Sequence, residues 1–504
     1  MTLNTFFEKF ALFADTPDAV GKMRELILLL ALDGKIGETN ATTWPRIQLG
    51  DLGEWGSGGT PLSSESRYYD GNIPWLIIGD LNDGVVTSSM KTITEEGLAN
   101  SSARMLPKGV LLIAMYGSIG KLGITDIECA TNQAIAFCKP DPKKADLRYL
   151  FHAFMGLRPK FFSRGQGLAQ KNISQRILRA WEIGLPPLAE QKRIVAKVDE
   201  LMALCDRLEV QQQEREQQHT ALSRASLARF ADAPTPANLQ LLFHKSYTIP
   251  PADLRKSILT LAVQGKLVPQ DPNDVAVEVP AVPRVTKSKG EREAPFDLPG
   301  NWKWMQLGQV SELINGDRSK NYPNKAEYVP EGVAWINTGH IEPDGTLSTE
   351  WMHFITRKKF DSLRSGKVRP GDLVYCLRGA TLGKTAIITQ YEEGAVASSL
   401  VIIRLSPVVE PRYAYRFLTS PLGREQIFQF DNGSAQPNLS ANNVKKYWVP
   451  IPPHAEQRRI VAKVDQLMAM VDALETRLSA SHTTAKNLLD ALVAELTSGS
   501  QKAS

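Results

Sequence analysis

An internal duplication constrains this chain more than any other feature of its sequence. Residues 186–209 and residues 452–475 agree at 18 of 24 positions, and both begin with Pro-Pro-x-Ala-Glu-Gln. Agreement of this length does not arise by chance, so the two halves are expected to repeat one structural unit. Each half is interpreted as a helical segment, then a globular domain, then a long helix.

The likeness extends to the start of each half. Residues 23–35 parallel residues 254–266, and a Trp followed by Gln-Leu-Gly occurs at residues 44–50 and again at 302–308. The second copy is therefore expected to start near residue 240, after the Pro-Thr-Pro at 234–236.

The middles of the two halves have diverged and are predicted to be α+β domains, at residues 43–184 and 298–450. They mix short β-rich runs, such as Val110–Met115 and Leu400–Leu405, with glycine-rich turns and a few short helices. The landmarks that they share are Trp75 with Trp335, Gly117 and Gly120-Lys121 with Gly379 and Gly383-Lys384, and residues 167–174 with residues 433–440. Both tryptophans are predicted to be core anchors rather than side chains that stack on bases.

The segments after each Pro-Pro are predicted to form long helices with a coiled-coil seam, since their apolar residues alternate spacings of four and three. Both second prolines are placed in the first helical turn, where proline is tolerated. A helix of about 40 residues spans roughly 60 Å, enough to hold two domains apart. The seam residues are Ile194, Val198, Leu201, Cys205 and Leu208 in the first copy, and Ile460, Val464, Leu467, Val471, Leu474 and Leu478 in the second.

The remaining segments follow from the duplication. We expect an N-terminal helical segment at 1–42, a central region at 185–268 that joins the first long helix to the second copy's helical segment, and a C-terminal long helix at 451–504. Residues 269–297 contain five prolines and few large apolar residues. This Pro-rich linker is expected to be extended and poorly packed.

Composition narrows the class of protein. The net charge of +5 suits a protein that meets a polyanion but does not require one. The four cysteines form no Cys-x-x-Cys pair and the seven histidines show no metal-ligand spacing, so neither a disulfide framework nor a metal site is expected. The apolar run at 26–32 is far shorter than the roughly 20 residues that span a bilayer. We expect a cytoplasmic protein without a membrane segment.

Three motifs together resemble the specificity subunits of type I restriction-modification enzymes. They are the two Pro-Pro-x-Ala-Glu-Gln helix starts, the run at residues 254–272, and the Gly-Ser-Gly-Gly-Thr-Pro turn at 56–61. The resemblance implies that each globular middle is a target recognition domain that reads one half of a split site in double-stranded DNA. It also implies that the long helices pack as an antiparallel coiled coil, with pseudo-twofold symmetry, and dock two modification (methyltransferase) subunits.

The resemblance further implies a non-catalytic chain. The sequence has no Asn-Pro-Pro-Tyr or Asp-Pro-Pro-Tyr motif and no glycine fingerprint for S-adenosylmethionine. S-adenosylmethionine, Mg and ATP are therefore expected in partner subunits, which include restriction (translocase/nuclease) subunits. Two alternatives stay open: an enzyme with an unfamiliar active site built on clustered carboxylates, and a coiled-coil scaffold that binds protein or RNA.

Candidate DNA contacts come from glycine turns, exposed amides and basic runs. The glycine-rich turns at 117–121 and 379–385 have the wrong glycine spacing for a P-loop, which leaves a plain strand-joining turn or a phosphate contact through their lysines. The matched segments at 170–172 and 436–438 either touch DNA or cap the following helix, and their presence in both copies favours capping. The candidates, with the bidentate donors predicted to lie on loops, are Arg67, Asn72, Lys121, Lys171, Arg318, Asn321, Arg357, Lys358, Lys359, Arg378 and Lys384.

Overall fold

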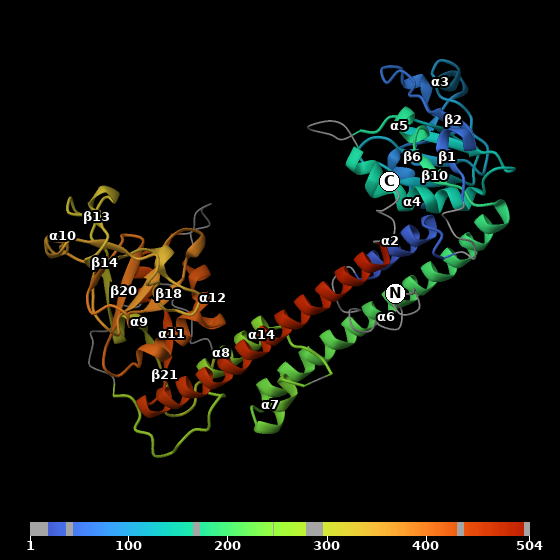
Figure 1. The fold of residues 1–504 in the computed structure, drawn as a ribbon. Helices are drawn as coiled ribbons and strands as arrows, with labels where there is room; N and C mark the ends of the chain where they lie inside the picture. The colour runs from blue at the N-terminus through green and yellow to red at the C-terminus, as the bar shows by residue number, and fades with distance from the viewer. Residues whose placement is uncertain are drawn as a thin grey trace. The chain divides into compact units, whose positions relative to one another are not determined.

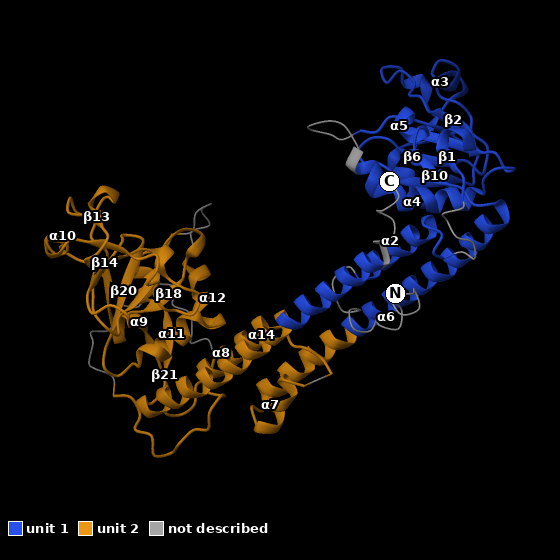
Figure 2. Ribbon diagram, viewed as in Figure 1, with its two compact units in different colours: residues 1–216, 480–504 blue, residues 217–479 orange. Residues whose placement is uncertain are grey.

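The computed structural model describes residues 19–36, 44–164, 172–244, 246–278, 296–430 and 438–497. The chain forms two compact units, shown in Figure 2: unit 1 contains residues 1–216 and 480–504, and unit 2 contains residues 217–479. Each unit has a short helix, a mixed domain of strands and helices, and part of each long helix. The mixed fold with two domains that the duplication predicted is confirmed.

The two long helices are α6 (Leu188–Asp232) and α14 (His454–Thr497), of 45 and 44 residues (Figure 1). Both run without interruption, as predicted. The placement of the prolines needs a correction, because each helix begins one residue after Pro187 or Pro453. The carbonyl oxygen of each proline accepts a hydrogen bond at 3.0 Å from the backbone N–H four residues later, so the proline lies at the cap.

In unit 1, α6 shares a hydrophobic core with α2 (Ala19–Leu32). Its seam residues Ile194, Val198, Leu201 and Cys205 are all buried in this core, together with the apolar face of α2. The last turns of α14 add Leu489 and Leu492. The residues that repeat at coiled-coil spacing therefore lie in one core with the opening helix of their own copy.

Unit 2 repeats this arrangement with α8 (Pro251–Val263). Ile460, Val464, Leu467 and Val471 of α14 are buried in one core with Leu254 and Ile258 of α8, and Phe230 near the end of α6 joins them. The short α7 (Pro236–Leu242) lies between α6 and α8 in the chain. The seam residues Leu208, Leu474 and Leu478 are only half-buried.

The domain of unit 1 contains two sheets. The larger has the order β2 (Gly53–Ser57), β9 (Ile135–Pro140), β6 (Leu111–Ala114), β7 (Leu122–Thr125), β4 (Gly84–Val86). The smaller has the order β5 (Thr92–Ile93), β3 (Tyr69–Leu76), β8 (Ala130–Thr131). A separate pair, β1 (Arg46–Gln48) with β10 (Glu182–Gly184), joins the two ends of the domain. Its helices are α3 (Glu95–Ala99), α4 (Leu147–Arg164) and α5 (Gln175–Arg179).

The domain of unit 2 has a similar plan. One sheet has the order β12 (Ser311–Asn315), β20 (Leu400–Leu405), β17 (Leu373–Cys376), β18 (Thr385–Ile387). The other has the order β13 (Tyr328–Val329), β15 (His353–Ile355), β14 (Val333–Ile336), β19 (Gly394–Val396), β16 (Lys367–Val368). β11 (Lys303–Gln306) pairs with β21 (Trp448–Ile451). The helices are α9 (Leu307–Val310), α10 (Arg357–Ser362), α11 (Pro411–Thr419), α12 (Pro421–Gln429) and α13 (Ala441–Lys445).

The domain cores contain the two landmark tryptophans. Trp75 on β3 and Trp335 on β14 are 5% and 1% exposed, which confirms them as core anchors. The predicted β-rich runs are also found, as β6 and β20. No helix in the part of the chain that the structure describes is long and apolar enough to cross a membrane.

The start of the Pro-rich linker is better packed than expected. Val277 is buried in the core of the unit 2 domain, and the Asp274 carboxylate pairs with Arg459 of α14 at 2.5 Å. Gln270 donates a hydrogen bond of 2.6 Å to Glu456. The linker start is thus anchored at Gln270, Asp274 and Val277, whereas the residues between these anchors are largely exposed, with Val275 at 82%. Residues 279–295 lie outside the described residues.

Candidate nucleic-acid interface

Three loops meet at one edge of the larger sheet in the unit 1 domain. Strands β2 and β6 end at this edge and β9 begins there, because Ser57 pairs with Ala136 and Ala114 pairs with Ile135. The loops are residues 58–61, 115–121 and 132–134, and we call them the loop edge of unit 1. Exposed loops on a rigid sheet are a common place for binding residues.

Backbone contacts hold the loop edge of unit 1 together. The N–H of Gly59 donates to Thr131 O at 2.9 Å, and the indole N–H of Trp75 donates to Gly59 O at 3.0 Å. A Cβ at Gly58 would lie only 2.0 Å from Thr131 O, so this position requires glycine. The Gly-Ser-Gly-Gly-Thr-Pro turn is thus a tightly packed part of the loop edge.

Unit 2 has an equivalent loop edge. Strands β12 and β17 end there and β20 begins there, since Asn315 pairs with Val401 and Cys376 pairs with Leu400. The loop edge of unit 2 consists of residues 316–322, 377–384 and 397–399. The two domains, different as they are in sequence, therefore present the same three connections.

A buried carboxylate shapes the first loop of the unit 2 edge. Asp317 is 3% exposed and accepts hydrogen bonds of 2.6 Å from the backbone N–H groups of Ser319 and Arg364. Burial raises the pKa of Asp317, but the hydrogen bonds outweigh it and the pKa lies below its usual value. Arg318 follows this anchored residue and is exposed.

The matched segments near 170 and 436 also reach the loop edges. Asn172 forms an isolated β-bridge with Tyr116, and Asn438 forms one with Arg378. Each asparagine thus pairs with the residue that precedes the first glycine of the glycine turn. Gln170, Gln436 and Pro437 lie outside the described residues.

The residues that cap the two short helices differ from the residues expected to cap them. The side chain of Ser174 caps α5 by accepting from Ile177 N, and Ser440 caps α13 by accepting from Asn443 N at 3.1 Å. The capping predicted for residues 170–172 and 436–438 is corrected to these serines, since Asn172 and Asn438 lie too early in the chain to serve the helix.

The glycine turns join strands, which is the first of the two interpretations given in the sequence analysis. Residues 117–121 connect β6 with β7, and residues 379–384 connect β17 with β18. Lys384 Nζ donates to the backbone carbonyl of Ile341 at 2.5 Å, so its amine already has an intramolecular partner. Lys121 is half-buried at the unit 1 edge.

Arg378 combines a fixed backbone with an exposed side chain. Its backbone pairs with Asn438, and its carbonyl oxygen accepts from Cys376 Sγ at 3.3 Å, while its side chain is exposed. A guanidinium on an ordered backbone loses less entropy on binding a base edge or a phosphate. Among the predicted DNA contacts in the second domain, Arg318 and Arg378 have side chains exposed at the loop edge.

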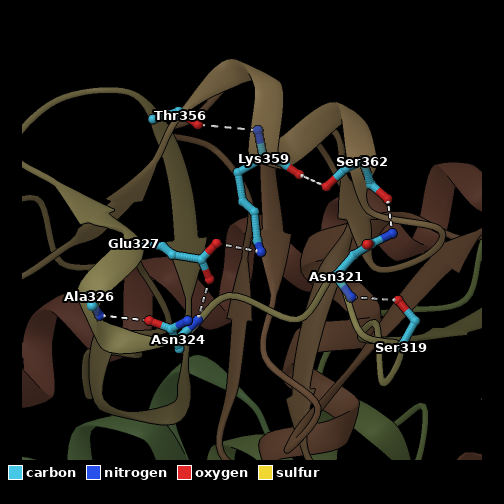
Figure 3. A network of polar contacts seen from close by, with 8 residues as sticks. All are labelled: Ser319, Asn321, Asn324, Ala326, Glu327, Thr356, Lys359 and Ser362. Carbon is cyan, nitrogen blue, oxygen red and sulfur yellow. Dashed lines mark hydrogen bonds and ion pairs between the residues drawn. The ribbon is translucent and has the colours of Figure 1, made fainter.

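Asn321 and Lys359 belong to the polar network that Figure 3 shows. Asn321 Nδ2 donates to Ser362 O at 2.7 Å, and Lys359 Nζ lies 2.7 Å from Glu327 Oε1. The contact with Lys359, together with the N–H of Asn324, lowers the pKa of Glu327. Both candidates therefore tie the segment after β12 to α10.

The basic run at 357–359 forms the start of α10. Arg357 makes an ion pair with Glu393, which raises the pKa of Arg357, and Lys358 is exposed. Of the three residues, Lys359 is the most buried, with a side chain that is 18% exposed. The run is thus partly a set of intramolecular pairs rather than three equal phosphate contacts.

Two of the remaining candidates lie on segments of the unit 1 domain other than the three loops of its edge. Arg67 lies in a 3-10 turn and forms ion pairs with Glu65 and Glu96 at 3.2 and 3.1 Å. Asn72 is exposed but lies within β3, so the prediction that it lies on a loop is wrong. The strand includes Asn72 because the buried Ile73 and Trp75 anchor the residues that follow it. Lys171 lies outside the described residues.

Two polar residues at the loop edge of unit 1 were missed from the sequence. The hydroxyl of Thr60 donates to Gln133 Oε1, and both side chains are exposed. The amide of Gln133 keeps its donor group, which suits adenine or phosphate contacts. Thr60 belongs to a motif that the sequence did single out, but Gln133 has no local signal.

Metal-ligand clusters and cysteine reactivity are two features of the described residues that bear on chemistry. They contain no group of three or more His, Cys, Asp or Glu side chains placed to hold a metal ion. The four cysteines are buried and unbridged. Burial raises the pKa of Cys205 to about 11, which keeps this thiol protonated at neutral pH.

Comparisons with known proteins agree with the duplicated plan. The family model described as "Type I restriction modification DNA specificity domain" matches residues 42–216 and again residues 299–481. The chain is 23% identical over 458 residues to the type I restriction enzyme EcoBI specificity subunit of Escherichia coli, covering 90% of this chain and 85% of that protein. It is 27% identical over 431 residues to the EcoAI specificity subunit of Escherichia coli, covering 76% and 69%.

The fold has a counterpart among solved structures. A chain from a structural study of the assembly and conformational transition of the type I R-M system superposes with a TM-score of 0.52 at 17% identity. It covers 90% of this chain and 97% of that one. At this identity the match concerns the fold alone.

Proposed function

Because this chain belongs to the type I restriction modification DNA specificity family, we propose that it reads an asymmetric, bipartite target in double-stranded DNA. Each domain reads one half-site through its loop edge. The observation that carries the proposal is the repeated loop edge, which has one backbone plan but different side chains in the two units. Thr60 and Gln133 occupy one edge, whereas Arg318 and Arg378 occupy the other.

The helices are the part of the chain to which we assign the binding of partner subunits. The long helices pair as an antiparallel coiled coil and dock two modification subunits, one for each copy of the repeat. Support comes from the way the helical cores repeat: α2 with α6 in unit 1, and α8 with α14 in unit 2. A surface that occurs twice offers the same contacts to two identical partners.

The chain acts without catalysing a reaction itself. Methyl transfer, ATP hydrolysis and cleavage belong to the modification and restriction subunits, which carry S-adenosylmethionine, Mg and ATP. The complex works in the cytoplasm, where it meets the cell's DNA. If both domains lie on one face of the duplex, the half-sites are about 10 bp apart from centre to centre.

Mapping of methylated adenines across a genome tests this function. Cells that express this chain with its modification subunit are compared with cells that lack this chain. We expect a split motif that disappears without this chain. Methylation that is the same in both strains would reject the proposal and favour a scaffold that binds protein or RNA.

Alanine substitutions at the loop edges test whether each domain reads one half-site. Arg318→Ala and Arg378→Ala are expected to change only one half of the methylated motif, and Thr60→Ala with Gln133→Ala only the other. The exposed Arg46→Ala variant, on β1 rather than on a loop edge, is the matched control. A change in both halves from either pair would contradict the assignment of one half-site to each domain.

A further inference from the structure

The Pro-Pro-x-Ala-Glu-Gln motif forms a joint between the unit 1 domain and its long helix. Gln191 is fully buried, and its Oε1 accepts a hydrogen bond of 2.7 Å from the N–H of Asp146, which precedes α4. Its Nε2 donates to Lys144 O at 3.1 Å and to Pro186 O at 2.8 Å. One side chain on α6 thus holds both the loop before α4 and the chain that leaves β10.

Unit 2 contains the same joint. Gln457 is also fully buried, and its Oε1 accepts from the N–H of Glu410 at 2.7 Å. Its Nε2 donates to Val408 O and to Pro452 O, both at 2.9 Å. The pattern of one accepted and two donated hydrogen bonds is the same in domains that have diverged almost everywhere else.

A second contact lies two turns further along each long helix. Asp199 accepts from Arg148 and lies 3.0 Å from His152 Nε2, both on α4. Asp465 occupies the same place on α14 and pairs with Arg416 at 2.6 Å and Arg412 at 3.0 Å, both on α11. Each domain is therefore attached to its helix at two points, which together resist rotation.

The chemistry of the joint makes it stiff. A buried amide that uses its oxygen and both protons has one favourable orientation, and any rotation leaves a buried polar group without a partner. The partners are backbone atoms, so each glutamine holds the main chain itself rather than a flexible side chain. Gln191 and Gln457 thus fix how each domain sits on the start of its helix.

Small changes at such a joint have large effects at a distance. The 45 residues of α6 extend for roughly 68 Å at 1.5 Å per residue. A tilt of about 5° at one end moves the other end by about 6 Å, which exceeds the 3.4 Å between neighbouring bases of a strand. The stiffness of the joint therefore matters for any function that depends on a fixed separation.

We propose that Gln191 and Gln457 are positioning residues that set which half-site separation the protein accepts, without reading any base. The inference rests on the proposed bipartite reading of DNA. Loss of either side chain loosens one domain on its helix. The protein then accepts targets whose two halves are one base pair closer or further apart, while the sequence of each half stays the same.

A library of methylation targets tests this inference. Both half-sites are kept constant and the spacer between them is varied one base pair at a time, and methylation is measured with the complete modification complex. We compare the native protein with Gln191→Ala, Gln457→Ala and the control Gln213→Ala, an exposed glutamine on α6. We expect methylation at spacers one base pair away to rise about tenfold relative to the native spacer in both joint variants only.

The conservative and second-site variants separate positioning from folding. Gln191→Glu keeps the acceptor for Asp146 but places a carboxylate oxygen against the carbonyl oxygens of Lys144 and Pro186, so it is expected to relax the spacing at least as much as Gln191→Ala. Asp199→Asn weakens the second contact at a partly exposed position, and it is expected to shift the spacer preference in the same direction. It replaces Gln191→Ala as the test variant if Gln191→Ala does not fold. Thermal unfolding of each variant shows whether it is folded.

The outcomes are distinct. Folded joint variants with native spacer preference would overturn the inference, and so would a uniform loss of methylation at all spacers. A native protein that methylates no split target would reject the proposed function and this inference with it. Relaxed spacing with unchanged half-sites is the result that supports the joint.

Discussion

Arg24 of α2 donates a hydrogen bond to Asp206 of α6 at 2.7 Å, and it also pairs with Glu209 at 2.6 Å. In unit 2, Arg255 of α8 pairs with Asp472 and Glu475 of α14 at 2.6 and 2.5 Å. The duplication has therefore preserved an ion triad that ties each opening helix to its long helix.

Removal of this triad is expected to lower the stability of the unit that contains it. Arg24→Ala and Arg255→Ala should each lower the free energy of unfolding by about 0.5–1 kcal/mol, because these arginines are about one-third exposed and water screens the pairs. Urea unfolding at low and high salt measures the effect, which should shrink with salt. An equal loss in Arg46→Ala, whose nearest carboxylate is 4.0 Å away, would contradict this explanation.

Arg378→Ala is expected to weaken binding in a base-specific way. A guanidinium that contacts a base edge contributes about 1–3 kcal/mol, so affinity should fall by roughly tenfold to a hundredfold with relaxed preference at one position. Arg357→Ala should have a smaller effect that is uniform across sequences, since Arg357 is paired with Glu393. Titrations of the assembled complex with matched and single-mismatch duplexes distinguish the two. Base-specific loss in Arg357→Ala alone would reverse the assignment.

The two turn lysines are expected to behave differently. Lys384→Met removes the hydrogen bond to Ile341 O and should lower the free energy of unfolding by about 1 kcal/mol, with little change in the salt dependence of DNA binding. Lys121→Met should leave stability nearly unchanged and reduce the slope of log affinity against log salt by about one. The same change in slope for both variants would show that Lys384 also contacts phosphate.

Two glycines of the unit 1 loop edge make a matched pair. Gly58→Ala places a Cβ 2.0 Å from Thr131 O and should cost about 1–3 kcal/mol and impair reading of the first half-site. At Gly117 (φ 64°) no atom of the described residues lies within 4 Å of the place that a Cβ would take, so Gly117→Ala should cost only about 1 kcal/mol of left-handed strain. Thermal unfolding and methylation mapping measure both effects. Equal effects would show that packing at Gly58 is less tight than the geometry indicates.

Acid is expected to destabilise unit 2 through His340. Burial, together with the neighbouring His353, lowers the pKa of His340 to about 4, from about 6.5 in the unfolded chain. The folded state therefore binds fewer protons between these values, and stability falls as the pH drops through this window. The loss should reach about 2 kcal/mol between pH 7 and pH 5. Urea unfolding of His340→Gln should lack this component, whereas the exposed His482→Gln should retain it.

Local patterns in the sequence predicted much of the architecture. The apolar spacing that begins at Ile194 and Ile460, with no proline or glycine to interrupt it, predicts long helices wherever they lie in space. The repeat of Pro-Pro-x-Ala-Glu-Gln predicts two like units because matching residues form matching structures. The burial of Trp75 and Trp335 follows from apolar runs around them. These features depend on neighbours along the chain, which are visible in the sequence.

The loop edges show where this kind of prediction fails. Gln133 and Thr60 lie 73 residues apart, and Lys359 and Glu327 lie 32 apart, so neither pair has a local signal. A basic residue looks the same in sequence whether its charge faces solvent or an intramolecular carboxylate. Asn321, Lys359 and Lys384 were therefore grouped with Arg318 and Arg378, although their polar groups have partners within the domain.

Residue order and periodicity are enough to establish the duplication and the two long helices, and three motifs carry the resemblance to the family. The folded chain is needed to know which side chains share a loop edge, which are held within the domain, and what Gln191 and Gln457 bind. Those roles depend on hydrogen-bond partners that the fold brings together from distant segments, and the free energy of a buried polar group is decided by these partners rather than by its neighbours in the chain.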